Sequence, residues 1–386
     1  MRMKKTTKML AIALCLVLAL GSLAGCAKKQ EETVKIGFLG ALTGDVANYG
    51  QPGLKGLQLA AEELNAKGGI LGKPIEILGE DNRGDKTEAA NLTTRYITQE
   101  KVAALVGDPC TGITKVAGKI AQDNQMVIIS AGATGTGVCE IGDYVFRDTL
   151  LDSVAAPATV EYLLGQNFKK IALVTATNDD YSVGLSGIFR KAVKDKGAAV
   201  VIEESIQKGD TNFAAQVTNI KAANSDLIIF TGYYTEAGLF MKEVRKQGMK
   251  QLFVGGDGCL GPDLVKLGGK AVEGSMVYCG FSPEQPTPET KKFLDAYAKK
   301  YNGAEADMFA AQYYDALMIL AKVMEETKST DPKVYVKALA KTANFPGASG
   351  VITFQADREP IKSPVYLLTV QDGKFKLKQK IDVKVQ

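Results

Sequence analysis

Hydrophobic and polar positions alternate along this chain in two periods, and the two periods take turns from residue 34 onward. Short apolar runs rich in β-branched residues predict buried strands, and apolar residues at helical spacing, such as Leu57, Ala61 and Leu64, predict the helices between them. This βαβα order is typical of a mostly parallel sheet with helices on both faces. In the first part of the chain we expect strands over 34–39, 74–78, 102–106 and 126–129, and helices up to Gly68-Gly69, over 87–100 and over 113–122.

The same alternation restarts after Asp152, which predicts a second, similar lobe. The expected helices cover 154–164, 183–196, 213–223 and 236–247, and the expected strands cover 170–175, 200–204, 226–230 and 251–254. Three prolines at 283, 286 and 288 then precede a helix-rich stretch over 290–339. The last expected strands lie near 351–354 and 364–370.

The first 32 residues have a different pattern. A basic start is followed by an apolar core over 9–20 and by Leu23-Ala24-Gly25-Cys26, which resembles a bacterial lipobox. The core is too short to span a bilayer, for which about 20 apolar residues are needed. We therefore expect a lipoprotein signal peptide over 1–25, lipidation of Cys26 and a polar tether over 26–32. The protein should then act outside the cytoplasm, anchored by lipid to the cell membrane.

Charge and composition exclude several classes of function. The chain has 47 basic and 43 acidic residues, and four of the basic residues lie in the predicted signal peptide, so the remaining chain is formally neutral. A neutral chain without a basic cluster lacks the electrostatic footprint of a nucleic-acid-binding protein. There is no histidine, which removes the commonest general base and the commonest metal ligand. With no nucleophile motif or Cys-x-x-Cys either, we expect no enzyme, no metal and no cofactor.

Four cysteines remain in the predicted mature chain besides Cys26: Cys110, Cys139, Cys259 and Cys279. An oxidising compartment would permit three full pairings among them, and buried free thiols are an equal alternative.

Candidate chemistry lies in the loops that follow predicted strands, because open α/β sheets bind ligands beyond the carboxyl ends of their strands. Thr111 opens a helix after one strand, where a hydroxyl and helix amides form an anion site; a simple N-cap is the alternative. The segment 130–134 follows the next strand. Tyr181, Tyr233 and Asp257 lie in three further loops, and a carboxylate beside a tyrosine suits an ammonium group. A solvated turn residue is the alternative for Asp257.

The segment 256–261 fits the pattern G-x-G-x-x-G. Its second position is Asp257, whose carboxylate would face a pyrophosphate, and no acid for a ribose follows at the expected distance. Dinucleotide binding is therefore not expected.

Several segments resemble the leucine/isoleucine/valine-type binding proteins of ABC importers. The resemblance begins at Val34-Lys35-Ile36-Gly37, is clearest over 61–74 (AEELNAKGGILGKP) and continues at Ala271-Val272-Glu273-Gly274 and Tyr314-Asp315-Ala316. It implies a two-lobed periplasmic-binding-protein type I fold with three crossovers. The first lobe would comprise 33–152 plus 282–364, and the second 153–281 plus 365–386.

The resemblance also implies a ligand site between the lobes. Thr111 and the loop with Gly132, Ala133 and Thr134 match the groups that hold the ligand carboxylate, and Tyr233, Asp257 and again Thr134 match those that hold its ammonium. The walls of the site match Tyr49, Pro109, Cys110, Tyr181 and Phe309. Asp257 is one methylene shorter than the glutamate of the family, and the family's cysteine partner for Cys110 is absent near Arg83, so that disulfide is not carried over.

The implied function is a monomeric receptor that captures an amino acid, with a branched aliphatic one expected, and delivers it to the permease of an ABC importer. A receptor of the same fold for an amide, a urea or an aromatic acid, or an extracytoplasmic ligand sensor, is the alternative.

Overall fold

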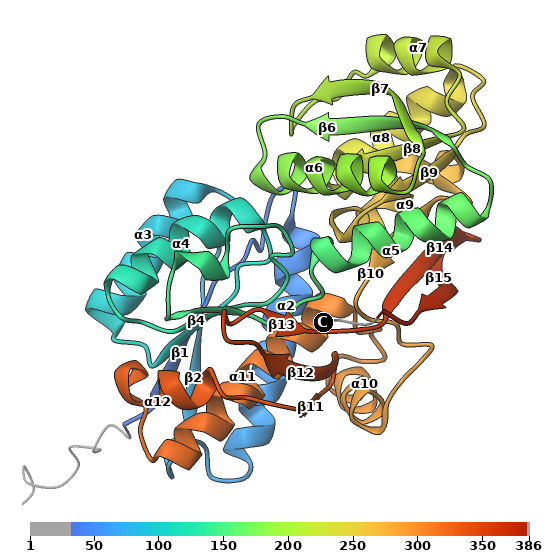
Figure 1. The fold of residues 1–386 in the computed structure, drawn as a ribbon. Coiled ribbons are helices and arrows are strands. Elements are labelled where there is room, and N and C mark those ends of the chain that lie inside the picture. The colour runs from blue at the N-terminus through green and yellow to red at the C-terminus, as the bar shows by residue number, and fades with distance from the viewer. Residues whose placement is uncertain (1–31, 384–386) are drawn as a thin grey trace, which may run out of the picture. The chain divides into compact units, whose positions relative to one another are not determined.

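The structure is a computed structural model that describes residues 32–383. Contacts group Val34–Gln386 into one unit, which carries all the helices and strands described below (Figure 1). The predicted signal peptide, the lipidation of Cys26 and most of the tether lie outside the described residues. Within them, no helix is long and apolar enough to cross a membrane.

The first sheet is parallel throughout and has the strand order β2-β1-β3-β4-β5. Its two central strands β3 and β4 are buried along their whole length, as expected for strands covered by helices on both faces. Its strands are β1 (Val34–Phe38), β2 (Ile75–Gly79), β3 (Ala104–Val106), β4 (Ile128–Ser130) and β5 (Val145–Arg147), and the helices between them are α2 (Ala47–Asn65), α3 (Lys86–Arg95) and α4 (Thr111–Asp123).

The second sheet has the order β15-β14-β10-β9-β8-β6-β7. Strand β14 pairs antiparallel with both of its neighbours, β10 and β15, and all other pairs are parallel. Its strands are β6 (Lys170–Ala176), β7 (Ala199–Ile206), β8 (Leu227–Thr231), β9 (Leu252–Gly255), β10 (Met276–Cys279), β14 (Val365–Gln371) and β15 (Lys374–Ile381). Its helices are α5 (Asp152–Gly165), α6 (Asp180–Asp195), α7 (Ala214–Ala223), α8 (Tyr234–Lys246) and α9 (Pro262–Gly268).

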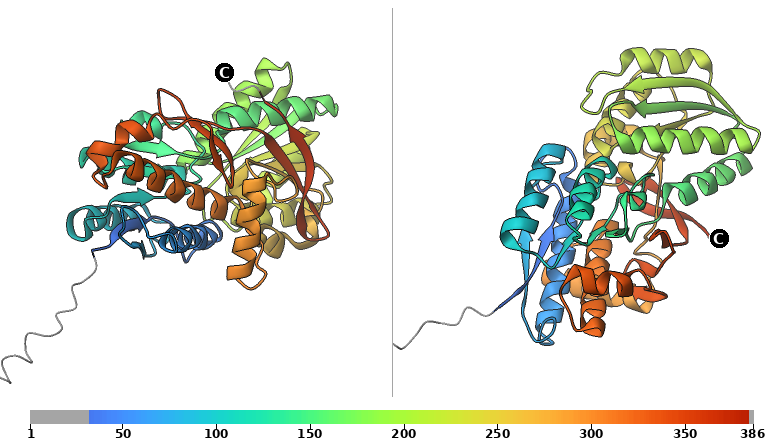
Figure 2. Two further views of the ribbon diagram at one scale, coloured as in Figure 1. Left: turned by 90° about the horizontal axis from the view of Figure 1, so that it is seen from below. Right: turned by 60° about the vertical axis from the view of Figure 1, so that its left-hand side comes forward.

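Between β10 and β14 the chain returns to the first sheet. It forms α10 (Pro288–Lys300), α11 (Met308–Thr327), α12 (Pro332–Leu339) and a small antiparallel sheet of β11 (Phe345–Gly347), β12 (Gly350–Phe354) and β13 (Pro360–Ile361). Helix α11 lies along α2 (Figure 2), and a Cβ on Gly56 would stand only 2.0 Å from the carbonyl oxygen of Ala310, so a glycine is needed for this approach. The chain thus passes between the two sheets three times, after β5, after β10 and before β14.

The sequence-based assignment missed five strands, β5, β10, β11, β13 and β15, and gave no bounds for the helix α9. Strand β5 has only three residues, β10 has four, and α9 is a two-turn helix that begins with Pro262. Strand β15 is an edge strand in which lysines alternate with apolar residues, a pattern that protects sheet edges but lowers mean hydropathy. The helix expected over 87–100 ends as an α-helix at Arg95 and continues as one π-helical turn over Tyr96–Glu100.

Candidate functional site

A small cavity lies where loops of the two sheets meet. Its volume is only about 10 Å³, room for little more than one water, against about 300–1,000 Å³ for pockets that bind drug-sized ligands. Nine of the eleven predicted site residues line it, together with Gly258: Tyr49, Pro109, Thr111, Gly132, Thr134, Tyr181, Tyr233, Asp257 and Phe309. The structure therefore brings most of the predicted residues together around one nearly closed space.

Asp257 is the acid that lines this cavity. It lies in the loop after β9 and only 4% of it is exposed, so it is not the solvated turn residue of the alternative interpretation. The Tyr181 hydroxyl donates to its Oδ1 at 3.0 Å, and the Thr134 hydroxyl lies 3.4 Å from the same oxygen. Burial, followed by the charge of a neighbouring Asp152, raises the pKa of Asp257 well above its ordinary value.

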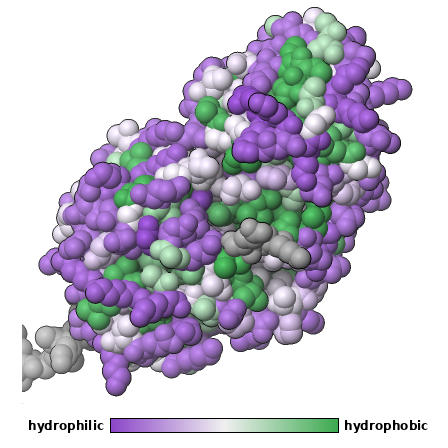
Figure 3. Space-filling model, in the orientation of Figure 1, coloured by the Kyte–Doolittle hydropathy of each residue, from purple (hydrophilic) through white to green (hydrophobic). Residues whose placement is uncertain are grey.

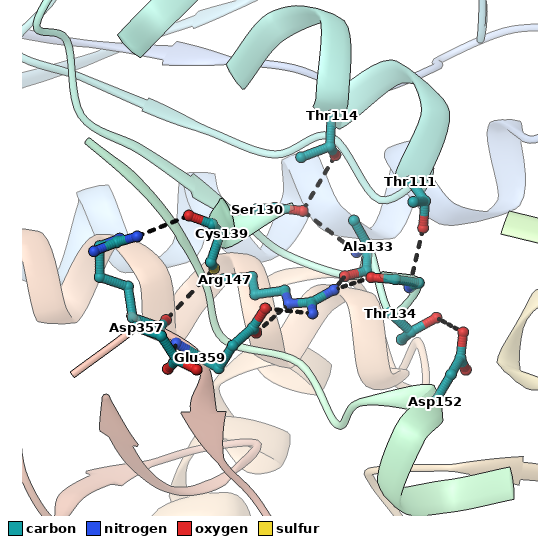
Figure 4. Close-up of polar contacts among 12 residues, drawn as sticks. Thr111, Thr114, Ser130, Ala133, Thr134, Cys139, Arg147, Asp152, Asp357 and Glu359 are labelled. Carbon is teal, nitrogen blue, oxygen red and sulfur yellow. Dashed lines mark hydrogen bonds and ion pairs between the residues drawn. The ribbon is translucent and has the colours of Figure 1, made fainter. Parts of the chain in front are cut away.

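Asp152 is a second buried acid at this end, and sequence analysis did not assign it to the site. It is the first residue of α5 and is fully buried. The Tyr278 hydroxyl donates to its Oδ1 at 2.6 Å, and the Thr134 hydroxyl lies 3.1 Å from its Oδ2 (Figure 4). Burial raises the pKa of Asp152 to about 6. Recognition of β5 would have exposed it as an acid in a loop that follows a strand of the first sheet.

Thr111 and the start of α4 form another part of the cavity lining. Cys110, not Thr111, is the N-cap of α4, and it makes no side-chain cap. The backbone N–H of Gly135 donates to the Thr111 Oγ at 3.1 Å (Figure 4). No donation by the Thr111 hydroxyl to another protein group is found among the described residues, so its hydrogen can point into the cavity beside the first amides of α4. This arrangement suits an anion.

Gly132 keeps the cavity open. Its φ of +138° lies in the region that favours glycine. A Cβ there would stand 2.9 Å from the Cβ of Pro109 and 3.1 Å from the ring of Phe309, both of which line the cavity. Any larger side chain would therefore push into these walls.

Aromatic rings form the rest of the wall. The ring centroids of Tyr49 and Phe309 are 4.5 Å apart, and those of Tyr181 and Tyr233 are 5.4 Å apart in a stacked arrangement. The Tyr233 hydroxyl donates to Asp179 at 3.3 Å, whereas it is Tyr181 whose hydroxyl bonds Asp257. In this structure Tyr181 is therefore the tyrosine that contacts the acid, and an ammonium contact from Tyr233 stays a prediction.

Two predicted residues, Cys110 and Ala133, do not line the cavity. Cys110 is buried, and like Cys139, Cys259 and Cys279 it is a free thiol. The amide of Ala133 donates to the Ser130 hydroxyl at 3.3 Å. Its carbonyl oxygen accepts from Arg147, so both backbone groups of Ala133 serve the loop.

Arg147 at the end of β5 supports that loop. Its guanidinium donates to both carboxylate oxygens of Glu359, at 2.5 and 2.6 Å, and to the carbonyl oxygens of Ala133 and Gly135 on either side of Thr134 (Figure 4). The pair is separated by 212 residues in sequence, and no local pattern signals it.

The glycines around Asp257 have a packing role. A Cβ on Gly256 would stand 2.5 Å from the Tyr181 hydroxyl oxygen, and one on Gly258 would stand 2.7 Å from the ring of Tyr181. Both glycines let this tyrosine approach the loop, and the carboxylate between them is buried against it. The G-x-G-x-x-G pattern is thus explained without a pyrophosphate.

A second, larger depression lies on the surface. Hydrophobic side chains gather near the middle of the face in Figure 3, and a groove lined by Val154, Pro157, Tyr162, Ile381 and other residues runs between α5 and β15. The two acids in its lining, Glu161 and Asp382, are exposed, whereas Asp257 in the small cavity is buried, so the small cavity is the better candidate for recognition of a charged solute.

Comparison with known proteins agrees with this geometry. Residues 33–374 match the profile of the family described as periplasmic binding protein. The chain is 28% identical over 309 residues, 80% of its length and 82% of the relative's, to a Leucine-, isoleucine-, valine-, threonine-, and alanine-binding protein of Pseudomonas aeruginosa.

Two solved structures share the fold over nearly the whole chain. The leucine binding protein LivK of Thermotoga maritima has a TM-score of 0.86 at 31% identity, covering 91% of this chain and 99% of that one. The branched-chain amino acid transporter substrate binding protein LivJ of Streptococcus pneumoniae, in complex with isoleucine, has a TM-score of 0.85 at 36% identity, covering 92% and 100%. These relatives are substrate-binding proteins and not enzymes. The predicted fold class is thereby confirmed, and the chain belongs to the periplasmic binding protein family with its type I fold.

Proposed function

We propose that this protein is a receptor for a free branched-chain amino acid and delivers it to an ABC importer. The observation that carries the proposal is the buried acid Asp257, which lines a small cavity together with the hydroxyl residues Thr111 and Thr134. A buried carboxylate without a cationic partner is costly. A ligand ammonium would remove that cost.

The two ends of the cavity fit the two charges of a zwitterion. At one end the ammonium would donate to Asp257 and to the Thr134 oxygen. At the other end the carboxylate would accept from the Thr111 hydroxyl and from backbone amides near the start of α4, where the helix dipole favours an anion. An amide, a urea or an aromatic acid lacks the ammonium that the acid end requires.

The walls fit an apolar side chain of limited size. Tyr49, Phe309 and Pro109 line the cavity, and the missing side chain of Gly132 avoids contact with Pro109 and Phe309. Relatives whose names state leucine, isoleucine and valine as ligands support this choice. The lipobox-like start of the chain supports an extracytoplasmic protein anchored by lipid. Docking on a permease, as a monomer, follows from the family of substrate-binding proteins and is part of the proposal.

Calorimetric titration of the purified, ligand-stripped protein tests the proposal. L-isoleucine should bind. Two analogues, 3-methylpentanoate without the amine and 2-methylbutylamine without the carboxylate, should each bind more weakly by about 2–5 kcal/mol, because each leaves a buried charged or polar group unpaired. That difference corresponds to a factor of about 30 to several thousand. If 3-methylpentanoate binds as tightly as isoleucine, the zwitterion receptor is wrong.

A further inference from the structure

Thr134 stands between two buried carboxylates, that of Asp257, which lines the cavity, and that of Asp152, which does not. Its Oγ lies 3.1 Å from Asp152 Oδ2 and 3.4 Å from Asp257 Oδ1 (Figure 4 shows the contact with Asp152). A threonine hydroxyl has one hydrogen and two lone pairs, so it can donate to only one of the two acids at a time.

The other hydroxyls at this end have their hydrogens committed. The backbone N–H of Gly258 donates to the Tyr181 oxygen at 3.1 Å, so the Tyr181 hydrogen is directed to Asp257. The Tyr278 hydroxyl donates to Asp152. The shorter of the two Thr134 contacts is also the one to Asp152. With its hydrogen on Asp152, the Thr134 oxygen presents a lone pair on the side of Asp257.

No basic side chain of the described residues hydrogen-bonds to either acid. Arg147 is the nearest positive charge to influence Asp152, but its donors are directed to Glu359 and to the carbonyl oxygens of Ala133 and Gly135. The acid end therefore has two carboxylates, three hydroxyls and no cation of its own.

We propose that Asp152 is a positioning residue that makes the cavity selective for a charged amine, because it takes the Thr134 hydrogen and so turns the Thr134 oxygen into an acceptor beside Asp257. This inference rests on the proposed function and extends it. Asp257 would accept one hydrogen of the ammonium and Thr134 a second. Asp152 would not touch the ligand but would add negative potential behind it.

The test is the selectivity of Asp152→Asn, measured as the ratio of the dissociation constants of 3-methylpentanoate and L-isoleucine. Ligand-observed NMR at millimolar concentration reaches the weaker ligand. The ratio should fall about 10- to 100-fold, since hydrogen bonds to charged groups contribute about 1.5–3 kcal/mol. Isoleucine binding weakens, while binding of the amine-free acid is unchanged or improves as the repulsion from Asp152 is lost.

Tyr278→Phe is the matched control, because it removes the other hydrogen bond of Asp152 and leaves the carboxylate beside Thr134 in place. Its selectivity should stay within about threefold of the unmodified protein, on the scale of a single net hydrogen bond. A role of Asp152 in packing alone would weaken both ligands equally and leave the ratio unchanged in Asp152→Asn. That result would overturn the proposal.

A double-mutant cycle tests the route through the hydroxyl. In a Thr134→Val background, Asp152→Asn should lower selectivity clearly less than it does in the unmodified protein, because the acceptor that it orients is gone. Additive effects would contradict action through Thr134. Thr134→Val also keeps the proposal testable if Asp152→Asn does not fold, since it should reproduce most of the selectivity loss. If the unmodified protein binds no isoleucine, the proposed function is wrong. If it binds isoleucine but the ratio is unchanged in Asp152→Asn, only the inference on Asp152 is wrong.

Discussion

The loop 130–135 lies between two buried groups of charges that are built in opposite ways. On one side Arg147 and Glu359 form a bidentate ion pair, with side chains only 4% and 11% exposed, and the remaining donors of Arg147 bind carbonyl oxygens of the loop. On the other side Thr134 contacts Asp152 and Asp257, whose partners are neutral hydroxyls. Both groups are buried, but only the Arg147–Glu359 group contains a positive charge that pairs with its acid.

This difference distinguishes buried charges that stabilise the fold from buried acids that can bind a ligand. A buried ion pair whose hydrogen bonds are satisfied holds its surroundings in place. A buried acid that faces a cavity without a cation is instead prepared for a cation from outside. The pKa values agree, because those of both cavity acids are raised.

A third buried cluster supports the same distinction. Asp148 and Asp315 share the environment of Lys362, whose Nζ donates to Ser349 at 2.6 Å. Ser349 and Ala348 in turn donate to Asp315. Unlike the Arg147–Glu359 pair, this cluster has one lysine for two acids, and neither carboxylate oxygen of Asp148 has a hydrogen-bond partner. We assign it to structure because it does not line the cavity.

The largest effect on stability should come from breaking the complete pair. Glu359→Gln leaves the Arg147 guanidinium buried without its counter-charge, so the free energy of unfolding should fall by about 3–5 kcal/mol in urea titrations. Glu203→Gln is a matched control, because Arg190 and Glu203 form a bidentate pair with side chains 50% and 44% exposed. Its effect should not exceed about 1 kcal/mol. Equal effects in the two variants would remove the distinction between them.

The opposite response is expected at the cavity. Asp257→Asn should lower the affinity for isoleucine by about 2–5 kcal/mol, a factor of about 30 to several thousand, because the ammonium loses its charged acceptor. The unliganded protein should be as stable as before or more stable at pH 7, because a costly buried acid is removed. Asp226→Asn, in an exposed turn where the carboxylate accepts from the amides of Lys169 and Lys170, should leave isoleucine affinity unchanged. A stability loss without an affinity loss in Asp257→Asn would make Asp257 a structural acid.

The sequence predicted the cavity better than it predicted the charges behind it. Thr111, Tyr181 and Asp257 were found because parallel strands place their following loops at one edge of a sheet, and this rule needs only the order of elements. Asp152 was missed because β5 is too short to show a pattern. The contact of Thr134 with Asp257 spans 123 residues and that of Arg147 with Glu359 spans 212. Such pairings depend on tertiary packing, so the sequence could not show which buried acids have a cationic partner and which have only hydroxyl partners.

The smallest effect is the pH dependence of binding, which is also the most direct test of whether the two acids lack a cationic partner. The pKa of Asp152 is raised to about 6, and that of Asp257 is raised well above its ordinary value. Above about pH 4, the two acids therefore hold more protons in the unliganded folded protein than in the unfolded chain. The stability contributed by these groups therefore falls as pH rises through this interval. A bound ammonium favours the ionised acids, so isoleucine should bind more tightly as pH rises from 5 to 7, by at most about tenfold per pH unit for each proton released.

The other groups that face the two acids do not account for such a slope. Burial raises the pKa values of Tyr181, Tyr278 and Cys259 well above their ordinary values, so these groups keep their protons from pH 5 to 7, and Arg147 contributes a constant positive charge. Calorimetry at pH 5, 6 and 7, in two buffers of different ionisation enthalpy, measures both the affinity and the protons released. Asp152→Asn should release fewer protons and show a shallower slope. An affinity that is flat over this range in the unmodified protein would mean that the cavity acids are already fully ionised before the ligand arrives.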